Sequence, residues 1–438
     1  MKLSHLPIIL CAAAAAVTAV ASCGGSKPAG TTGEGRDYVS VRDGEFIVAD
    51  TVYRYVGTNF WYGVILASEG RGGDRARLHA ELDTLRAMGI DNLRILVGGD
   101  GSETEPSHIS PVLQVSPGVY NDTLLGGLDY LLAELEKRDM KAVLYLNNAW
   151  EWSGGFGTYL EWAGAGPAVN PARDGYPAYM AYASQFVRND SAKALSAAHV
   201  RNIVGRTNSL TGKPYAESPA IMAWQVANEP RAFADESKEA LADWIGETAA
   251  LIKSIDPNHL VSVGSEGSWG CENDMDLWAR IHSNPDIDYA TIHIWPYNWS
   301  WVSEATVSDS VGRACVNTTD YINAHHAALR AALGERGEMK PIVLEEFGYP
   351  RDGMATAQGT PVSGRDAYYE HVFSTVAEGG NISGVNFWGW GGLAQAPHTT
   401  WQPGDPYTGD PAQEAQGLNS VFASDSTTIS IIRKYAGR

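Results

Sequence analysis

The chain has 438 residues, of which 44% are hydrophobic, enough for one large domain with a substantial core or for two smaller ones. Its formal net charge of −19 at pH 7 argues against nucleic acids and anionic membrane surfaces as partners, because both are negatively charged. The 14 Trp and 20 Tyr residues serve mostly in core packing, but flat aromatic rings also stack on sugars, so some are candidates for an open cleft.

The first 36 residues are predicted to lie outside the folded domain. Lys2 supplies a basic start, and an apolar run from Leu6 to Val20 leads to Cys23. Residues 1–22 are typical of a bacterial lipoprotein signal peptide, because the run is too short for a membrane span and cleavage would leave Cys23 lipidated. An ordinary secretory signal with a chance cysteine is the alternative. Residues 23–36 are rich in Gly, Ser and Thr and predict a flexible tether. We therefore expect an exported protein that is lipid-anchored to a bacterial membrane; the absence of an acidic residue after Cys23 favours the outer membrane or cell surface.

From residue 37 onward, short apolar runs alternate with amphipathic stretches. Val39–Val41 and Phe46–Val48, joined by Asp43-Gly44, predict a hairpin that closes the floor of a barrel. The eight candidate barrel strands are Arg54–Asn59, Asn92–Val97, Lys141–Asn147, Ile221–Asn228, Leu260–Gly264, Tyr289–Ile294, Pro341–Glu346 and Gly384–Trp388. Strands that alternate with helices form parallel βαβ units, so residues 37–438 are predicted to be one α/β domain, a (β/α)8 or TIM barrel.

Helices and loops are predicted between these strands. The helices are Asp74–Met88, Leu124–Arg138, Ser237–Ile255, Thr319–Leu333 and Asp366–Ala377. Long loops rich in Trp and Gly are expected at Trp150–Tyr176, Pro296–Asn317 and Trp390–Leu418. All three follow the C-terminal ends of strands, where a barrel of this type builds its active site.

Two glutamates stand at the ends of predicted strands. Glu229 ends the fourth strand region, before Pro230, and Glu346 ends the seventh. Strands four and seven lie on opposite sides of a closed barrel, so the two carboxylates can face each other across its mouth. Hydrolysis of a sugar bond needs such a pair, roughly 5–5.5 Å apart for retention and farther apart for inversion. Glu345 directly precedes Glu346, so its side chain is expected on the other side of the strand, either as an acid that supports the site from behind or as a structural acid.

A set of motifs in order connects these acids to a known family. Besides Trp224–Arg231 and Leu344–Gly348, the motifs are Val56–Trp61, Ser116–Tyr120, Asn147–Trp150, Ser254–His259, His293–Pro296 and Phe387–Trp390. On these residues, from about Tyr38 to Trp390, the chain resembles glycoside hydrolase family 5, and within it the endo-β-1,4-mannanases. The resemblance implies that Glu229 is the acid/base and Glu346 the nucleophile. The acid must hold a proton and the nucleophile must be ionised, and two close carboxylates push their pKa values apart.

The same resemblance implies several substrate-binding residues. Arg94 looks like the cation that keeps the nucleophile charged, and Asn228 like the amide that holds the sugar hydroxyl beside the reacting carbon. Trp388 matches the Trp beneath the reacting ring, while Asn148 and Trp150 match the mannanase form of the third strand.

Two positions near the sixth strand leave alternatives open. His293 is either a hydrogen-bonding partner in the cleft or a core histidine. Trp295 stands where family members often carry a Tyr whose hydroxyl lies near the nucleophile; an indole donates a hydrogen bond but accepts none, so its role stays open. Candidate outer subsites, for each of which loop packing is an alternative, are Trp61, Trp152, Trp162, Trp299, Trp301 and Trp390.

The sequence gives no clear indication of a disulfide bond or of a metal site. Cys271 and Cys315 are the two cysteines of residues 37–438, and an exported protein can keep a disulfide between them, although two separate buried thiols fit the sequence equally well. The sequence has no metal-ligand spacing and no phosphate-binding Gly loop, so no metal or cofactor is expected.

The resemblance leads us to expect a retaining endo-β-1,4-mannanase acting on internal bonds of mannan, glucomannan or galactomannan. Alternatives with the same mechanism are an exo-acting β-mannosidase or mannobiohydrolase, and a β-1,4-glucanase; loops that wall off one end of the cleft favour exo action. An alternative of another class is a non-catalytic, glycan-binding surface lipoprotein, against which the presence of both acids and Arg94 argues. The oligomeric state is left open.

Overall fold

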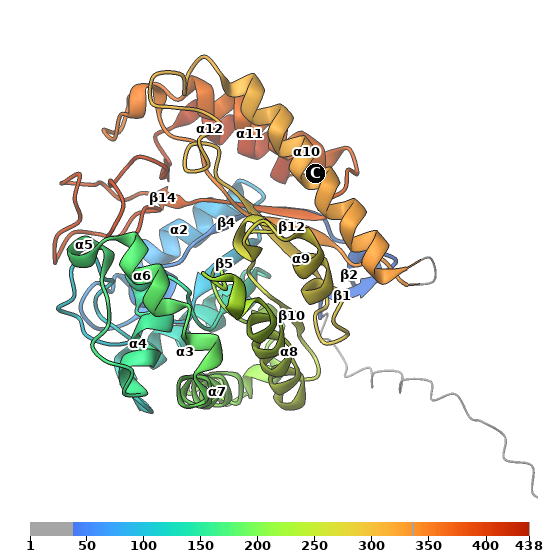
Figure 1. Ribbon diagram of the computed structural model, residues 1–438. Helices are drawn as coiled ribbons and strands as arrows, with labels where there is room; N and C mark the ends of the chain where they lie inside the picture. The colour runs from blue at the N-terminus through green and yellow to red at the C-terminus, as the bar shows by residue number, and fades with distance from the viewer. Residues whose placement is uncertain (1–37, 335–336, 438) are drawn as a thin grey trace, which may run out of the picture. The chain divides into compact units, whose positions relative to one another are not determined.

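The computed structural model describes residues 38–334 and 337–437. The predictions for residues 1–22 and 23–36, including the lipidation of Cys23, lie outside these residues. Eight parallel strands form one sheet in the order β10-β9-β8-β5-β4-β13-β12-β11, with helices around its outside (Figure 1). The strands are β4 (Tyr55–Asn59), β5 (Asn92–Leu96), β8 (Lys141–Tyr145), β9 (Ile221–Gln225), β10 (Leu260–Ser262), β11 (Ala290–Ile294), β12 (Ile342–Phe347) and β13 (Gly384–Phe387). Each matches a predicted strand, and the TIM-barrel prediction is confirmed.

The seam between β10 and β11 is closed by single hydrogen bonds instead of a strand ladder among the described residues. Asp288 N donates to Val261 O at 2.8 Å, and Val261 N donates to the Asp288 carboxylate at 2.7 Å. Near the C-terminal end, His293 N donates to Glu266 O at 3.3 Å. The sheet is therefore nearly closed, and the loop after β10 is held beside β11 at the mouth of the barrel.

The barrel floor is formed by a small antiparallel sheet of β1 (Ser40–Arg42), β2 (Glu45–Val48) and β3 (Thr51–Val52). Phe46 is fully buried, and its ring lies 5.2 Å from that of Tyr289 and 6.2 Å from that of Tyr55. It packs with apolar residues at the N-terminal ends of the barrel strands, such as Met222 and Leu260. The predicted hairpin therefore covers the end opposite the strand C-termini, as expected.

The main helices alternate with the strands. They are α2 (Arg75–Ala87), α3 (Asp122–Lys137), α7 (Asp190–Val204), α8 (Lys238–Ile255), α9 (Met275–His282), α10 (Val311–Leu333), α11 (Ser363–Ala377) and α12 (Ser426–Ala436). The five predicted helices are confirmed within a few residues, except that α10 begins at Val311 instead of Thr319. None of the helices in the described residues is both long and apolar enough to cross a bilayer.

The three predicted loops differ in structure. The first is largely helical and holds η1 (Glu151–Ser153), α4 (Gly155–Trp162) and α5 (Pro171–Asp174), and α6 (Tyr176–Ala183) starts at its end. Its glycines obscured these helices, because Gly lowers helix propensity, yet Gly154 and Gly155 supply the positive φ values, +92° and +50°, that the turn into α4 requires. The third contains β14 (Trp390–Gly392), which pairs with β15 (Val421–Phe422), and is otherwise irregular.

Candidate active site

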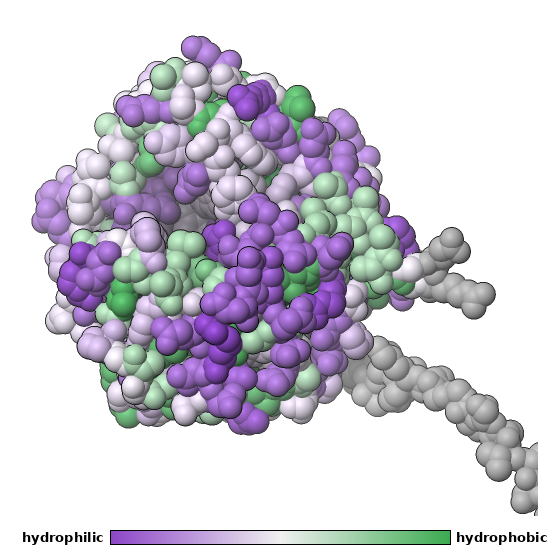
Figure 2. Space-filling model, viewed as in Figure 1, coloured by the Kyte–Doolittle hydropathy of each residue, from purple (hydrophilic) through white to green (hydrophobic). Residues whose placement is uncertain are grey.

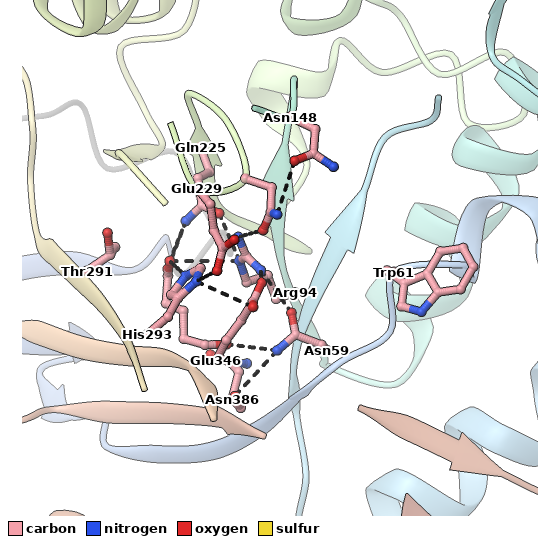
Figure 3. A network of polar contacts seen from close by, with 12 residues as sticks. Asn59, Trp61, Arg94, Asn148, Gln225, Glu229, Thr291, His293, Glu346 and Asn386 are labelled. Carbon is pink, nitrogen blue, oxygen red and sulfur yellow. Dashed lines mark hydrogen bonds and ion pairs between the residues drawn. The ribbon is translucent and has the colours of Figure 1, made fainter. Parts of the chain in front are cut away.

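A buried arginine organises the polar side chains at the C-terminal ends of the barrel strands (Figure 3). Arg94, on β5, is 0% exposed. Its guanidinium donates to Glu346 Oε1 at 2.5 Å and to Asn228 Oδ1 at 2.8 Å. It also donates to Gln225 Oε1 at 2.8 Å and to Asn59 Oδ1 at 3.0 Å. Because these four acceptors come from the ends of three different strands, β4, β9 and β12, Arg94 fixes their positions relative to one another.

The two predicted acids lie together at this mouth. One carboxylate oxygen each of Glu229 and Glu346 and a ring nitrogen of His293 all lie within 4.8 Å of one another. The backbone of Glu229 has φ +48°, an uncommon value for a glutamate, and its N–H donates to Gly264 O at 2.8 Å. Among the described residues these three form the one group of acidic and histidine side chains close enough to hold a metal ion, and it coincides with the candidate catalytic acids.

His293 bridges the two acids. Its Nδ1 lies 2.8 Å from Glu229 Oε1 and 3.4 Å from Glu346 Oε2. Trp150 Nε1 donates to the other Glu229 oxygen, Oε2, at 2.6 Å. Both oxygens of Glu229 are therefore oriented by named partners, and His293 is a member of the polar network instead of an isolated core histidine.

The protons of this group are shared differently from the sequence-based expectation. Burial lowers the pKa of His293, but the charges of Glu346 and Glu229 and hydrogen bonds to carboxylates raise it overall to about 9. Burial raises the pKa of Glu229, but His293, Trp150 and Arg94 together bring it below its ordinary value. Burial raises the pKa of Glu346 above its ordinary value although His293 and Arg94 oppose this rise. These shifts favour a protonated His293 that is hydrogen-bonded to an ionised Glu229.

The expectation that Glu345 faces away from the barrel interior is wrong. The pairing of β11 with β12 runs Ile292 to Leu344 and then His293 to Glu346, so Glu345 is the extra residue of a bulge. Its carboxylate accepts two hydrogen bonds from Gln225 Nε2, at 2.7 and 2.9 Å, inside the barrel. The bulge therefore interrupts the alternation that the prediction assumed.

The aromatic residues predicted beneath the sugar lie in the cleft. Trp388 is 3% exposed and Trp295 is 9% exposed, and their rings are 6.0 Å apart at 73°. No hydrogen bond joins Trp295 to Glu346 within the described part of the chain. Asn148 lies behind the cleft, where its Oδ1 accepts from Asn228 Nδ2 at 3.2 Å, so it positions Asn228.

A cleft of about 330 Å³ opens over the two acids. It is lined by Trp150, Glu151, Trp152, Tyr176, Asn228, Glu229, Arg231, Glu266, Trp269, Trp295, Asn298, Trp299, Glu346, Trp388, Gln413 and Glu414. The space-filling view shows a hollow with hydrophilic residues on the face drawn in Figure 2. Trp152 and Trp299, two of the predicted outer-subsite residues, therefore line this cleft.

Four other tryptophans do not line this cleft. Trp61 is 1% exposed and donates to Gly409 O at 3.1 Å, and Figure 3 shows it apart from the polar network. Trp390 is 0% exposed and donates to Glu81 Oε2 at 2.8 Å. Trp162 packs on Tyr159, and Trp301 on Trp299. The outer subsites predicted at Trp61 and Trp390 are corrected, because these two rings are fully buried against protein, whereas Trp162 and Trp301 are half-buried and their role as outer subsites stays a prediction.

The comparisons with known proteins agree with this geometry. A family model described as GH family 5 beta-mannosidase-like matches residues 36–438. The chain belongs to glycoside hydrolase family 5. It is a glycoside hydrolase of the mannanase and mannosidase type.

Named relatives of this family 5 protein include endo-acting enzymes and a mannosidase. The putative mannan endo-1,4-beta-mannosidase 9 of Oryza sativa subsp. japonica is 31% identical over 356 residues, which cover 78% of this chain and 79% of that protein. The crystal structure of the family 5 mannosidase from Rhizomucor miehei superposes with a TM-score of 0.83 at 33% identity, covering 92% of this chain and 98% of that one. The endo-beta-1,4-mannanase from Thermotoga petrophila gives a TM-score of 0.66 at 26% identity, covering 88% of this chain and 76% of that one.

The cysteines of this family 5 domain are not joined. Cys271, buried at the end of η5 (Trp269–Cys271), and Cys315, half-buried on α10, both carry free thiols. Cys271 lies near Ser265, whereas Cys315 lies near Tyr349 and Tyr368. The disulfide alternative is therefore not realised, because the two thiols lie in different surroundings.

Several cleft residues escaped the sequence reasoning. They are Glu151, Tyr176, Arg231, Glu266, Trp269, Asn298, Gln413 and Glu414, together with Gln225 and Asn59 beneath the cleft. Signals existed for some of them: Arg231 ends the Asn-Glu-Pro-Arg motif, and the three predicted long loops contain Glu151, Tyr176, Asn298, Gln413 and Glu414. Nothing in the sequence says which residue of a long loop returns to the cleft.

Proposed function

We propose that this protein is a retaining hydrolase of β-1,4-mannosidic bonds that works by double displacement. The observation that carries the proposal is the separation of the Glu229 and Glu346 carboxylate oxygens, within 4.8 Å. Retention requires two carboxyl groups roughly 5–5.5 Å apart, whereas inversion needs a gap of about 6.5–9.5 Å to admit a water molecule between the general base and the sugar.

The first step uses Glu346 as nucleophile. Its carboxylate oxygen attacks the anomeric carbon, the bond to the leaving oxygen breaks, and Glu229 delivers a proton to that oxygen. A glycosyl ester on Glu346 results. In the second step Glu229 takes a proton from a water molecule, the water oxygen bonds to the anomeric carbon, and the carboxylate of Glu346 is released.

The residues around the acids have matching roles in this proposal. Arg94 donates to Glu346 and Asn228 at once, so it couples the position of the nucleophile to that of the amide for the neighbouring sugar hydroxyl. His293 supplies the proton reserve for Glu229, since its Nδ1 is hydrogen-bonded to Glu229 Oε1. Trp388 offers an apolar platform for the reacting ring.

The enzyme has two candidate modes of cleavage, either at internal bonds of the polymer or from a chain end. Cleavage of internal bonds of mannan, glucomannan or galactomannan is supported by the motif set and by the names of the Oryza relatives. Cleavage from a chain end is supported by the polar side chains of two loops that line one part of the cleft, and by the likeness to the Rhizomucor mannosidase.

Product stereochemistry and one variant test the chemistry. Wild-type enzyme should release the β-anomer first from a soluble β-mannan when the reaction is followed by NMR, and Glu346→Ala should lose activity by several orders of magnitude. An α-anomer as first product, or near-native turnover by Glu346→Ala, would contradict the proposal. Binding of mannan without new reducing ends by the wild type would point to the glycan-binding alternative.

We also propose export and lipid attachment at Cys23, on the basis of the N-terminal sequence. The full-length chain should partition into the membrane fraction of a bacterial host, and Cys23→Ala should release it. A soluble wild-type protein with an unmodified Cys23 would contradict this.

A further inference from the structure

One part of the cleft wall is built from polar side chains that the proposed chemistry does not use. Glu151 follows β8 in η1, and Gln413 and Glu414 lie in the loop between β14 and β15. Tyr176, at the start of α6, lines the same cleft. The charges of Glu151 and Glu414 both raise the pKa of the Tyr176 phenol, after the larger effect of burial, so the two acids converge on this residue.

Glu151, Gln413 and Glu414 each have one hydrogen-bond acceptor atom without a partner among the described residues. Glu151 Oε2, Gln413 Oε1 and Glu414 Oε2 are buried and have no hydrogen-bond partner within the part of the chain that the structure describes. Glu151 as a whole is 9% exposed. Buried acceptors are normally satisfied, because leaving one unpaired costs free energy, so three of them at one cleft wall indicate a ligand that brings donors.

The charges in this part of the cleft define that ligand further. Burial raises the pKa of Glu151 to about 7, and burial together with Asp410 and Glu346 raises that of Glu414 well above its ordinary value. The arginine lining the cleft, Arg231, instead faces Glu266 at 3.5 Å and Glu272 at 3.3 Å. A wall of carboxyl groups without a cation disfavours an anionic sugar and suits neutral hydroxyl groups, which donate to either form of a carboxyl group.

The wall lies on the nucleophile side of the site. Glu414 lies in the long loop that follows β13, and β13 pairs with β12, the strand that carries Glu346. Glu266 instead follows β10, which pairs with β9, the strand that leads to Glu229. Because the nucleophile bonds to the sugar that stays on the enzyme and the acid/base serves the leaving sugar, Glu414 lies toward the retained sugar.

The loop that carries Gln413 and Glu414 is held in place. Asp410 is 0% exposed, and its carboxylate accepts from the N–H groups of Gly417 at 2.8 Å, Asn419 at 2.9 Å and Ser420 at 3.1 Å. Gln416 Nε2 also donates to Asp410 O at 2.9 Å. Such a network fixes the wall before substrate arrives, so it acts as a standing barrier.

We propose that Glu151, Gln413 and Glu414 bind the free hydroxyls of the sugar at the non-reducing end of a mannan chain. The enzyme then removes short products from that end, because a chain continuing past the retained sugar would meet this wall. The inference rests on the proposed function, since it assumes that Glu346 attacks the retained sugar.

The product pattern of the wild-type enzyme tests the inference without any variant. With mannopentaose labelled at its reducing end, chain-end action should give labelled products that shorten in order, the longest appearing first. Labelled products of all sizes from the first time point, with the β-anomer formed, would overturn the inference and leave the proposed function intact. No hydrolysis of any β-mannoside, or formation of the α-anomer, would overturn the proposed function itself.

Variants of the wall locate the interaction. Glu414→Ala and Glu151→Ala should each lower kcat/KM on mannobiose about tenfold, the loss expected for a hydrogen bond to a carboxyl group. Glu414→Gln keeps an acceptor oxygen and should stay within about threefold of the wild type. The control is Glu161→Gln, which removes a carboxylate from an exposed position on α4 and should leave kcat/KM unchanged. Unchanged values for both alanine variants, with melting temperatures that show a folded protein, would contradict the assignment.

Discussion

Glu345 and Glu346 are neighbours on β12, and both of their carboxylates nevertheless lie inside the barrel. The bulge opposite Ile292 and His293 makes this possible. Glu346 reaches the mouth, where Arg94 donates to it at 2.5 Å, whereas Glu345 accepts from Gln225 Nε2 at 2.7 and 2.9 Å below. Since Gln225 Oε1 in turn accepts from Arg94 Nε at 2.8 Å, the lower acid orients the arginine that serves the upper one.

This arrangement predicts unequal losses for the same substitution at two adjacent positions. Glu346→Gln removes the nucleophile and should lower kcat by about 10⁴-fold or more. Glu345→Gln retains one acceptor for Gln225 and should lower kcat by only about tenfold, through a displaced Arg94. The measurement is kcat on a soluble β-mannan for both variants. Equal losses, or a larger loss for Glu345→Gln, would mean that the nucleophile has been placed on the wrong glutamate.

A second prediction concerns the dependence of activity on pH. His293 has its pKa raised from 6.5 to about 9, so the proton that Glu229 needs should leave the site only as the pH approaches that value. In His293→Gln the proton must sit on the carboxyl group of Glu229, and the alkaline limb of kcat/KM should move down by about one pH unit or more. The control is His326→Gln on α10, which should leave this limb in place. An alkaline limb shared by wild type and His293→Gln would contradict the role of His293 as proton reserve.

The same shift has a consequence for stability. Because the pKa of His293 in the folded protein lies above 6.5, its stabilising contribution is complete below that pH and is lost as the pH rises through about 9. Wild type should therefore lose more of its thermal stability than His293→Gln between pH 6 and pH 10, as read from melting curves.

Much of the fold was predictable because its signals are local. Several barrel strands are apolar runs that lead into a polar or turn residue, as β9 leads to Asn228 and β10 to Gly264. Helices such as α3 carry an apolar face and an Asn121 cap that accepts from Thr123 N at 3.0 Å. The helices between β8 and β9 were less readable, because α4 begins with Gly155-Phe156-Gly157 and so combines poor helix formers with residues chosen for packing.

The residues of the active site likewise fall into those that local sequence signals predict and those that they do not. Glu229, Glu346, Arg94 and Asn228 sit at strand ends, and a closed barrel brings strand ends together whatever the loops do. The bulge at Glu345 depends on pairing between two strands, and the return of Glu414 to the cleft depends on the fold of a long loop around Asp410. Neither has a local signal, because each is decided by contacts between segments far apart in the sequence.

Gly348 predicts a steric test of Trp295. A Cβ at Gly348 would lie 2.6 Å from Trp295 Cζ3, so the ring would have to move, and its contact with Trp388 would change. Gly348→Ala should raise KM several-fold and lower the free energy of unfolding by about 1–3 kcal/mol. The control is Gly312→Ala on α10, where a Cβ meets nothing within 4 Å and should leave KM unchanged. A Gly348→Ala enzyme with native KM would mean that the position of Trp295 does not matter for substrate binding.

Trp388 and Trp390 are two residues apart, and the structure gives them separate tasks. Trp388 lines the cleft, and its buried Nε1 has no partner among the described residues. Trp390 donates to Glu81 Oε2 at 2.8 Å, and Glu81, itself 0% exposed, also accepts from Arg77 Nε and Leu393 N, both at 3.0 Å. One ring is therefore available to substrate, and the other completes a buried hydrogen-bond cluster.

Replacing each of these two tryptophans with Phe should separate binding from stability. Trp390→Phe leaves Glu81 with one donor fewer and should lower the free energy of unfolding by about 1–3 kcal/mol while kcat/KM changes less than about twofold. Trp388→Phe breaks no hydrogen bond in the described structure but reduces the platform under the sugar, so kcat/KM should fall about tenfold with a smaller change in stability. Denaturant melts and initial rates on the same preparations measure both quantities. If Trp390→Phe instead weakened substrate binding at full stability, the outer subsite first predicted at Trp390 would have to be restored, and the burial of its ring would be irrelevant to function.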